Sequence, residues 1–148
     1  MTDISAVLAK VPTGLLINGR WRDSSDGATF DVENPATEEK LATLASATGE
    51  DAVAALDAAV AAQEEWARTS PRFRSEILRR AFELVTERAE TFATLMTLEM
   101  GKPLAEARGE VTYGAEYLRW FAEETVRHYG RHTAVSYTHL RAHETRRH

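Results

Sequence analysis

The sequence predicts an α/β protein in which short strands come first and three to four helices follow. Three observations support this order. An Asn-Gly pair lies between two short apolar runs near residue 18, apolar residues recur at helical spacing between about residues 50 and 129, and Gly and Pro residues fall at the boundaries of these segments. No internal repeat or low-complexity linker divides the chain.

The strands form the first part of the predicted fold. We expect four of them, at about residues 15–18, 21–23, 29–33 and 40–45. Asn18 and Gly19 connect the first two as a β-hairpin, because both residues tolerate the positive φ of a type I′ turn. Pro35 ends the third strand, since proline cannot donate to a ladder. Strands this short have exposed edges and need a packing partner.

Two helices are predicted next, over about residues 50–66 and 71–88. Thr48 and Asp51 resemble a capping box in which Asp replaces Glu or Gln at the third helical position. The apolar stripe of the first helix consists of Ala52, Val53, Leu56, Ala59 and Val60. Ser70 and Pro71 supply an N-cap and a first-turn proline for the second helix.

A third helix is predicted up to Met100 and a fourth over about residues 103–129. Gly101 fits the position that closes a helix in the left-handed conformation, and Pro103 fits the first turn of the next one. One side of the fourth helix carries Leu104, Val111, Ala115, Leu118, Ala122 and Tyr129. Gly109 and Gly114 lie inside this helix, where each costs about 1 kcal/mol relative to Ala, so we expect another segment to approach its backbone closely.

The composition excludes several classes of protein. A formal charge of -5 is opposite to that of a general nucleic-acid binder. No apolar stretch approaches the roughly 20 residues that span a bilayer, and the first fourteen residues do not have the pattern of a secretory signal. The chain has no cysteine and therefore no disulfide framework. We expect a cytoplasmic protein with no membrane and no nucleic-acid partner.

Several motifs occur in the order typical of one enzyme family. They are Leu16-Ile17-Asn18-Gly19-Arg20-Trp21, Val32-Glu33-Asn34-Pro35-Ala36-Thr37, Leu95-Met96-Thr97-Leu98-Glu99, Gly101-Lys102-Pro103-Leu104-Ala105-Glu106-Ala107 and Trp120-Phe121-Ala122-Glu123-Glu124. Between about Leu15 and Arg131 the chain thus resembles the amino-terminal part of an NAD(P)-dependent aldehyde dehydrogenase, most closely the succinate-semialdehyde group. Residues 1–131 would then form the amino-terminal part of the cofactor-binding domain, truncated before the Rossmann core.

The resemblance implies a function for the complete enzyme. It would oxidise succinate semialdehyde, or a similar short semialdehyde such as glutarate semialdehyde, to the acid with NAD⁺ or NADP⁺, and it would be a homo-oligomer. The catalytic Cys, the general-base Glu and the cofactor-binding residues of the family lie downstream of the segment present here. The fragment itself is therefore predicted to be inactive and to bind no dinucleotide. The competing hypothesis is a non-catalytic helical interaction module that folds alone.

The resemblance also implies two sites. Tyr113 and Gly109 match positions that line the substrate entrance channel, although an aromatic residue at helical spacing can equally belong to a core. Val32, Glu33 and Glu99 match the residues that hold a structural monovalent cation in several family members, whereas Glu99 could simply be a solvated carboxylate at a helix end. The single glycine of Gly101-Lys102-Pro103 favours helix capping over a phosphate cradle.

The last residues differ from the rest of the chain. All five histidines lie in the last 21 residues, and residues 132–148 resemble translated adapter or vector sequence, so we interpret them as a non-family tail. Without their three Arg and one Glu, the remaining chain has 15 basic and 22 acidic residues and a net charge of -7. The pairs His128 and His132, and His139 and His143, have a spacing that can bind zinc on a helix, but each pair offers only two ligands.

Overall fold

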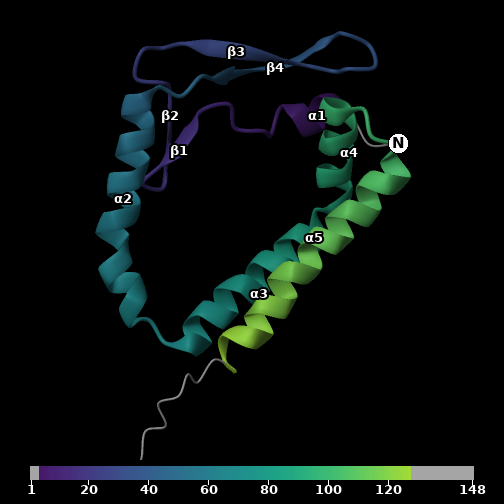
Figure 1. The fold of residues 1–148 in the computed structure, drawn as a ribbon. Helices are drawn as coiled ribbons and strands as arrows, with labels where there is room; N and C mark the ends of the chain where they lie inside the picture. The colour runs from purple at the N-terminus through teal and green to yellow at the C-terminus, as the bar shows by residue number, and fades with distance from the viewer. Residues whose placement is uncertain (1–3, 128–148) are drawn as a thin grey trace, which may run out of the picture.

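The structure, a computed structural model, describes residues 4–127 and confirms the predicted α/β class (Figure 1). Two antiparallel hairpins are followed by four long helices. The elements are α1 (Ile4–Leu8), β1 (Leu15–Ile17), β2 (Arg20–Arg22), β3 (Thr29–Glu33), β4 (Lys40–Ala45), α2 (Gly49–Arg68), α3 (Pro71–Glu87), α4 (Ala89–Met100) and α5 (Leu104–Thr125).

Turn and cap residues determine where these elements begin and end, as predicted. Asn18 and Gly19 have φ values of 51° and 72° in the β1–β2 turn, which is the left-handed region that a type I′ turn requires. The Thr48 side chain accepts from the Asp51 backbone N–H, and the full capping box is present. Ser70 caps α3, with proline at its first turn. Gly101 closes α4 with φ 71°.

The structure differs from the sequence prediction at three places. The helix α1 was not predicted, because five residues are too few to show a helical period. Strand β2 begins at Arg20 and not at residue 21, since Ile17 pairs directly with Arg20 across a two-residue turn. The last helix begins after Pro103 and ends at Thr125, short of residue 129. Tyr129 lies outside the described residues.

The helices and hairpins form an open frame, as Figure 1 shows. Helices α3 and α5 run side by side along one edge, α2 stands apart on the opposite side, and the β3–β4 hairpin spans the top. The buried core lies where α4 meets α5 and is small. It consists of Ala93, Ala107 and Val111, with Val85, Ala89, Met96 and Leu104 packed against them. None of the helices within residues 4–127 is long and apolar enough to cross a membrane.

Helix α2 has the amphipathic stripe that was predicted, but this stripe is not buried. Val53, Leu56 and Val60 are 57%, 62% and 59% exposed. In most proteins an amphipathic helix is stabilised chiefly by packing of its apolar face. Among the described residues, α2 is instead held at its two ends by polar contacts.

Asp51 holds the amino-terminal end of α2. Its side chain is only 1% exposed, and its Oδ1 accepts from Arg22 Nη2 at 2.6 Å. Its Oδ2 accepts from the backbone N–H groups of Thr48 at 3.0 Å and Ser25 at 3.1 Å. These backbone donors, with the Arg22 guanidinium, hold the pKa of Asp51 well below its usual range. One carboxylate thus caps α2 and ties it to the segment that follows β2.

Arg74 holds the carboxyl-terminal end of α2. Its guanidinium donates to the carbonyl oxygens of Trp66 at 2.9 Å and Ala67 at 3.0 Å, and its Nε donates to Thr69 Oγ1 at 2.8 Å. It also lies over the Trp66 ring, 5.5 Å from the centroid. A cation at a helix carboxyl end satisfies carbonyl groups that have no partner inside the helix. Arg74 therefore stabilises the corner between α2 and α3, together with Thr69, whose hydroxyl group also donates to the Trp66 carbonyl at 2.7 Å.

We call the contacts of Asp51 with Arg22, Ser25 and Thr48 the joint between α2 and the β1–β2 hairpin. We expect Asp51→Asn to weaken this joint, because it removes the charge that pairs with Arg22. Amide exchange at Ser25 and Thr48 should become about ten-fold faster, the factor that corresponds to one charge-assisted hydrogen bond. In the unsubstituted chain the joint should survive mild acid. Folding lowers the pKa of Asp51. The stability that its carboxylate contributes is therefore present above the ordinary pKa of an aspartate and is lost only as pH falls through the lower pKa of the folded state.

The matched control is Asp31→Asn, because Asp31 also accepts from a threonine and a lysine but lies exposed on β3. This control should leave exchange at Ser25 and Thr48 unchanged. Equal exchange rates in both variants, or loss of protection already near pH 5, would show that Asp51 does not secure the joint.

Candidate functional site

Helix α5 carries two apolar faces. One face contains the buried residues Ala107, Val111, Ala115 and Ala122. The other, which we call the aromatic face, consists of Tyr113, Tyr117, Trp120 and Phe121. These four follow the spacing i, i+4, i+7 and i+8 of a single helix side. They are exposed, with Tyr113 at 65% and Trp120 at 60%.

Two tyrosines order one end of the aromatic face. The hydroxyl groups of Tyr113 and Tyr117 are hydrogen-bonded at 2.5 Å, and their rings meet edge to face with centroids 5.1 Å apart. The bond to Tyr113 raises the pKa of the Tyr117 hydroxyl. With Glu116, the four aromatic residues line a shallow hollow of about 310 Å³. The arrangement offers an apolar surface with one pair of hydroxyl groups.

Gly109 lies one turn before Tyr113, where it continues the line of the aromatic face. A Cβ built at Gly109 or at Gly114 meets no atom within 4 Å. The close approach predicted from these two glycines is therefore absent among residues 4–127, because this side of α5 faces no other described element. At Gly109 the absence of a side chain leaves open space beside Tyr113.

The residues proposed for a cation lie near one end of the β3–β4 hairpin and the end of α4. Val32 is half-buried on β3, whereas Glu33 and Glu99 are exposed. The Pro35 ring lies 3.1 Å from the position of a Cβ on Gly101, so the turn after β3 packs against the end of α4. Within residues 4–127 there is no group of three or more Asp, Glu or His side chains that could hold a metal. A cation here would depend on main-chain carbonyls together with one carboxylate.

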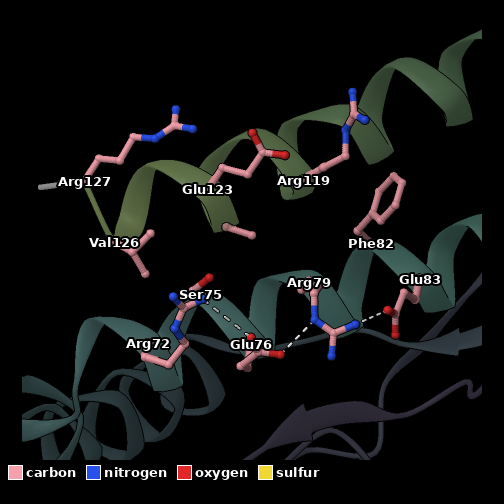
Figure 2. A pocket seen from close by; sticks show the side chains of 11 residues that line it. Arg72, Ser75, Glu76, Arg79, Phe82, Glu83, Arg119, Glu123, Val126 and Arg127 are labelled. Carbon is pink, nitrogen blue, oxygen red and sulfur yellow. Dashed lines mark hydrogen bonds and ion pairs between the residues drawn. The ribbon is translucent and has the colours of Figure 1, made fainter.

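A groove between α3 and α5, of about 410 Å³, was not predicted from the sequence (Figure 2). Charged side chains from both helices line it, and Figure 2 shows Glu76 and Arg79 on one side and Arg119 and Glu123 on the other. Its four arginines all have carboxylate partners, in the pairs Arg72–Glu76, Arg79–Glu76, Arg79–Glu83, Arg119–Glu116 and Arg127–Glu124. Because its positive charges are paired, the groove has no strong attraction for an anionic ligand.

The sequence alone could have indicated the ion pairs of this groove, since most of them join residues three or four apart on one helix. It could not indicate that the two helices pack side by side. The histidine pairs of the tail lie outside the described residues.

The described fold is an α/β arrangement of two hairpins followed by packed helices, with Gly-Lys-Pro joining the last two, and comparison with known proteins identifies its family. The aldehyde dehydrogenase family profile matches residues 21–147. The chain therefore belongs to the aldehyde dehydrogenase family, and its fold is that of the amino-terminal part of this family.

Individual relatives agree with this assignment. A succinate-semialdehyde dehydrogenase of Paenarthrobacter nicotinovorans is 80% identical over 92 residues, which cover 62% of this chain and 20% of the relative. A glutarate-semialdehyde dehydrogenase of Pseudomonas putida is 46% identical over 77% of this chain and 24% of the relative. The crystal structure of an NADP-dependent enzyme from E. coli superposes with a TM-score of 0.81 at 40% identity, over 90% of this chain and 27% of that one. The chain thus spans about a quarter or less of these relatives' lengths.

Proposed function

We propose that this chain forms the amino-terminal part of an aldehyde dehydrogenase that oxidises succinate semialdehyde, or a similar short semialdehyde, to the acid with NAD⁺ or NADP⁺. The observation that carries the proposal is the 80% identity to the Paenarthrobacter nicotinovorans succinate-semialdehyde dehydrogenase. The identity of 46% to a glutarate-semialdehyde dehydrogenase keeps that substrate as the second candidate.

The reaction requires groups that this chain does not contain. A thiolate attacks the aldehyde, hydride passes from the thiohemiacetal to the nicotinamide, and water then hydrolyses the thioester. The chain has no cysteine, so no thioester can form on it. In the full-length enzyme, this part of the chain forms one wall of the substrate channel and supports the cofactor-binding domain. The full-length enzyme is proposed to be a cytoplasmic homo-oligomer.

The proposal is tested on the full-length protein, obtained by extending the reading frame in genomic DNA past the codon for Arg131. Its kcat/KM is measured for succinate semialdehyde, glutarate semialdehyde and a neutral aldehyde of similar length, each with NAD⁺ and NADP⁺. Succinate semialdehyde should give the highest value. Preference for glutarate semialdehyde would favour the second candidate, and preference for the neutral aldehyde would contradict both.

We further propose that Tyr113 and Gly109 line the substrate channel of the full-length enzyme. Support comes from their geometry: Tyr113 presents an exposed ring fixed by its bond to Tyr117, and the missing side chain of Gly109 leaves space next to it. A cation held by the Val32 and Glu33 main chain and the Glu99 carboxylate is likewise a proposal. The packing of Pro35 against Gly101 supports it, because this contact joins the two segments that would supply the oxygens.

Replacing Tyr113 with Ala in the full-length protein is expected to change kcat/KM selectively. A channel wall acts differently on substrates of different size, and the change should be about ten-fold for a short relative to a bulky aldehyde, the effect of one or two methylene-sized contacts. The melting temperature should change little, because a ring that lines an open channel is not packed on the side that faces the channel.

Tyr113→Phe is the matched control, since it keeps the ring and removes only the hydroxyl group bonded to Tyr117. It should retain the ratio between the two aldehydes. If Tyr113→Ala reduced both substrates equally and in step with stability, the tyrosine would be a packing residue and the channel assignment would be wrong.

A further inference from the structure

The turn between β1 and β2 contains an asparagine followed by a glycine, and this pair is chemically reactive. The chain has two asparagines, Asn18 and Asn34, and only Asn18 precedes a glycine. The backbone nitrogen of the next residue can attack an asparagine side-chain amide, and glycine hinders this attack least because it has no Cβ. Asn34 is followed by Pro35, whose nitrogen carries no hydrogen and cannot form the same ring. The sequence therefore offers one asparagine that reacts readily in this way.

The surroundings of Asn18 leave its amide unrestrained. Asn18 and Gly19 are both exposed, and the Asn18 side chain makes no hydrogen bond with any of residues 4–127. A Cβ built on Gly19 meets no atom within 4 Å, so the space beside the attacking residue is open. Asn34 differs, because its Oδ1 accepts from the backbone N–H of Ala36 at 2.9 Å.

A second turn, at Asp26 and Gly27, shows how such a side chain is restrained. Asp26 Oδ1 accepts from the Ala28 backbone N–H at 2.8 Å and from Ser24 Oγ at 2.7 Å. The bonds from Ala28 and Ser24 hold the pKa of the Asp26 carboxyl below its usual range. Asp26 therefore stays an anion, and a carboxylate resists attack by a nucleophile. Of these two turns, only the one at Asn18 presents a reactive side chain.

The hairpin controls when Asn18 reacts. In the closed turn φ is 51° at Asn18 and 72° at Gly19. This type I′ geometry directs the Gly19 nitrogen away from the Asn18 side chain, so the Asn18 Cα–C bond must rotate before attack. Strands β1 and β2 have three residues each, and an isolated two-stranded hairpin is only marginally stable in water. Local opening of the hairpin therefore gives the nitrogen access to the amide.

We propose that Asn18 deamidates spontaneously through Gly19 and that the isoaspartate product weakens the joint at Asp51. The Gly19 nitrogen loses its proton to hydroxide and bonds to Asn18 Cγ. The Cγ–Nδ2 bond then breaks, and ammonia leaves with a proton from water, which forms a five-membered succinimide. Hydrolysis of this ring at Cγ gives aspartate, whereas hydrolysis at the main-chain carbonyl gives isoaspartate, in which the chain runs through Cβ and Cγ. One water is consumed and one ammonia released, with no oxidation or reduction.

Isoaspartate at residue 18 alters the hairpin because it adds one methylene group to the main chain of a two-residue turn. The closed turn pairs Ile17 directly with Arg20, and this register continues to Arg22 at the end of β2. The other end of the hairpin has little room for a shift, since a Cβ on Gly14 would lie 2.7 Å from the Arg22 carbonyl oxygen. Displacing β2 moves Arg22 and the segment after it, and the joint is weakened.

Peptide mapping of the 148-residue chain tests the chemistry. The chain is incubated at neutral and at mildly alkaline pH and digested with trypsin, which places Asn18 and Asn34 on separate peptides, residues 11–20 and 23–40. Residue 18 should gain the mass difference between an amide and an acid, in both aspartate and isoaspartate forms, at a rate proportional to hydroxide concentration. Asn34 should stay an amide. An amide at residue 18 that reacts no faster than Asn34, or at a rate independent of pH, would overturn the proposal.

Asn18→Gly is the matched control, because a Gly-Gly pair also forms a type I′ turn but has no side-chain amide. In the isoaspartate fraction of the aged chain, the Ser25 and Thr48 amides should exchange about ten-fold faster than in fresh chain, the factor that corresponds to one charge-assisted hydrogen bond. The aged Asn18→Gly chain should keep its fresh rates, and the Val111 amide in α5 should be unchanged in both. Unchanged exchange at Ser25 and Thr48, or equally faster exchange at Val111, would refute a specific effect on the joint.

Discussion

The purified 148-residue chain is expected to give no reduction of NAD⁺ or NADP⁺ in the presence of succinate semialdehyde. Enzymes commonly accelerate their reactions by about a million-fold or more, and in this family the acceleration depends on a covalent thiol adduct. The sequence contains no cysteine. Both sheets within residues 4–127 are antiparallel pairs, so this part of the chain lacks the crevice at which a parallel Rossmann sheet binds a dinucleotide.

The measurement is absorbance at 340 nm over a range of aldehyde concentrations, with the full-length protein as the positive control. A thiol reagent should abolish the activity of the full-length control. The 148-residue chain should stay at the buffer rate whether or not the reagent is added. Turnover that follows the chain through a second purification step would require a mechanism without a cysteine, and the proposal that this chain is only part of the active enzyme would have to be abandoned.

Local features of the fold were predictable because they depend on neighbouring residues. The Asn18-Gly19 turn, the Thr48–Asp51 capping box and the Gly101 cap each involve groups within four residues of one another, and all three are present. Their geometry follows from backbone sterics and from hydrogen bonds that the helix ends would otherwise lack.

Features that depend on distant residues were not predictable. The capping box indicated that Asp51 would bond to Thr48, but not that Arg22 and the Ser25 backbone would share the same carboxylate. Likewise, the periodicity of α2 indicated an apolar side, but a pattern cannot show whether a partner is present to cover it. The same limit applies to the aromatic face: helical spacing places its residues on one side of α5 but cannot show whether that side is exposed.

The assignments of Tyr113, Gly109, Val32, Glu33 and Glu99 remain predictions, because the family resemblance provided them and the described geometry only supports them. Within residues 4–127 no group of three or more acidic side chains could hold a metal, so the proposed cation site rests on main-chain oxygens and one carboxylate. The contact between Pro35 and Gly101 joins β3 to α4, whereas the channel requires a second wall that none of residues 4–127 provides.

The chain alone, or its residues 1–131, is expected to melt broadly, with strong helical circular dichroism but little cooperativity. The buried apolar residues of the described part are few and mostly small: Val7, Ala93, Leu98, Ala107, Val111, Ala115 and Ala122. Sixteen large apolar side chains are exposed there, including four on α2 and four on the aromatic face. Fully burying a Leu or Phe side chain contributes about 1.5–3 kcal/mol, and only part of this contribution is made at each exposed position.

Calorimetry and dye binding together measure the effect. A cooperative domain absorbs about 0.7 kcal/mol per residue near 60 °C, and the calorimetric enthalpy of the chain should be well below that value. A dye specific for exposed apolar surface should bind the chain before heating and should not bind the full-length protein, in which the same side chains are covered. The helical signal should persist because the caps of α2, α3 and α4 are local. A sharp transition whose calorimetric and van't Hoff enthalpies agree, with no dye bound, would instead identify residues 1–131 as an independent helical module, and the exposed faces of α2 and α5 would then be binding surfaces for other molecules.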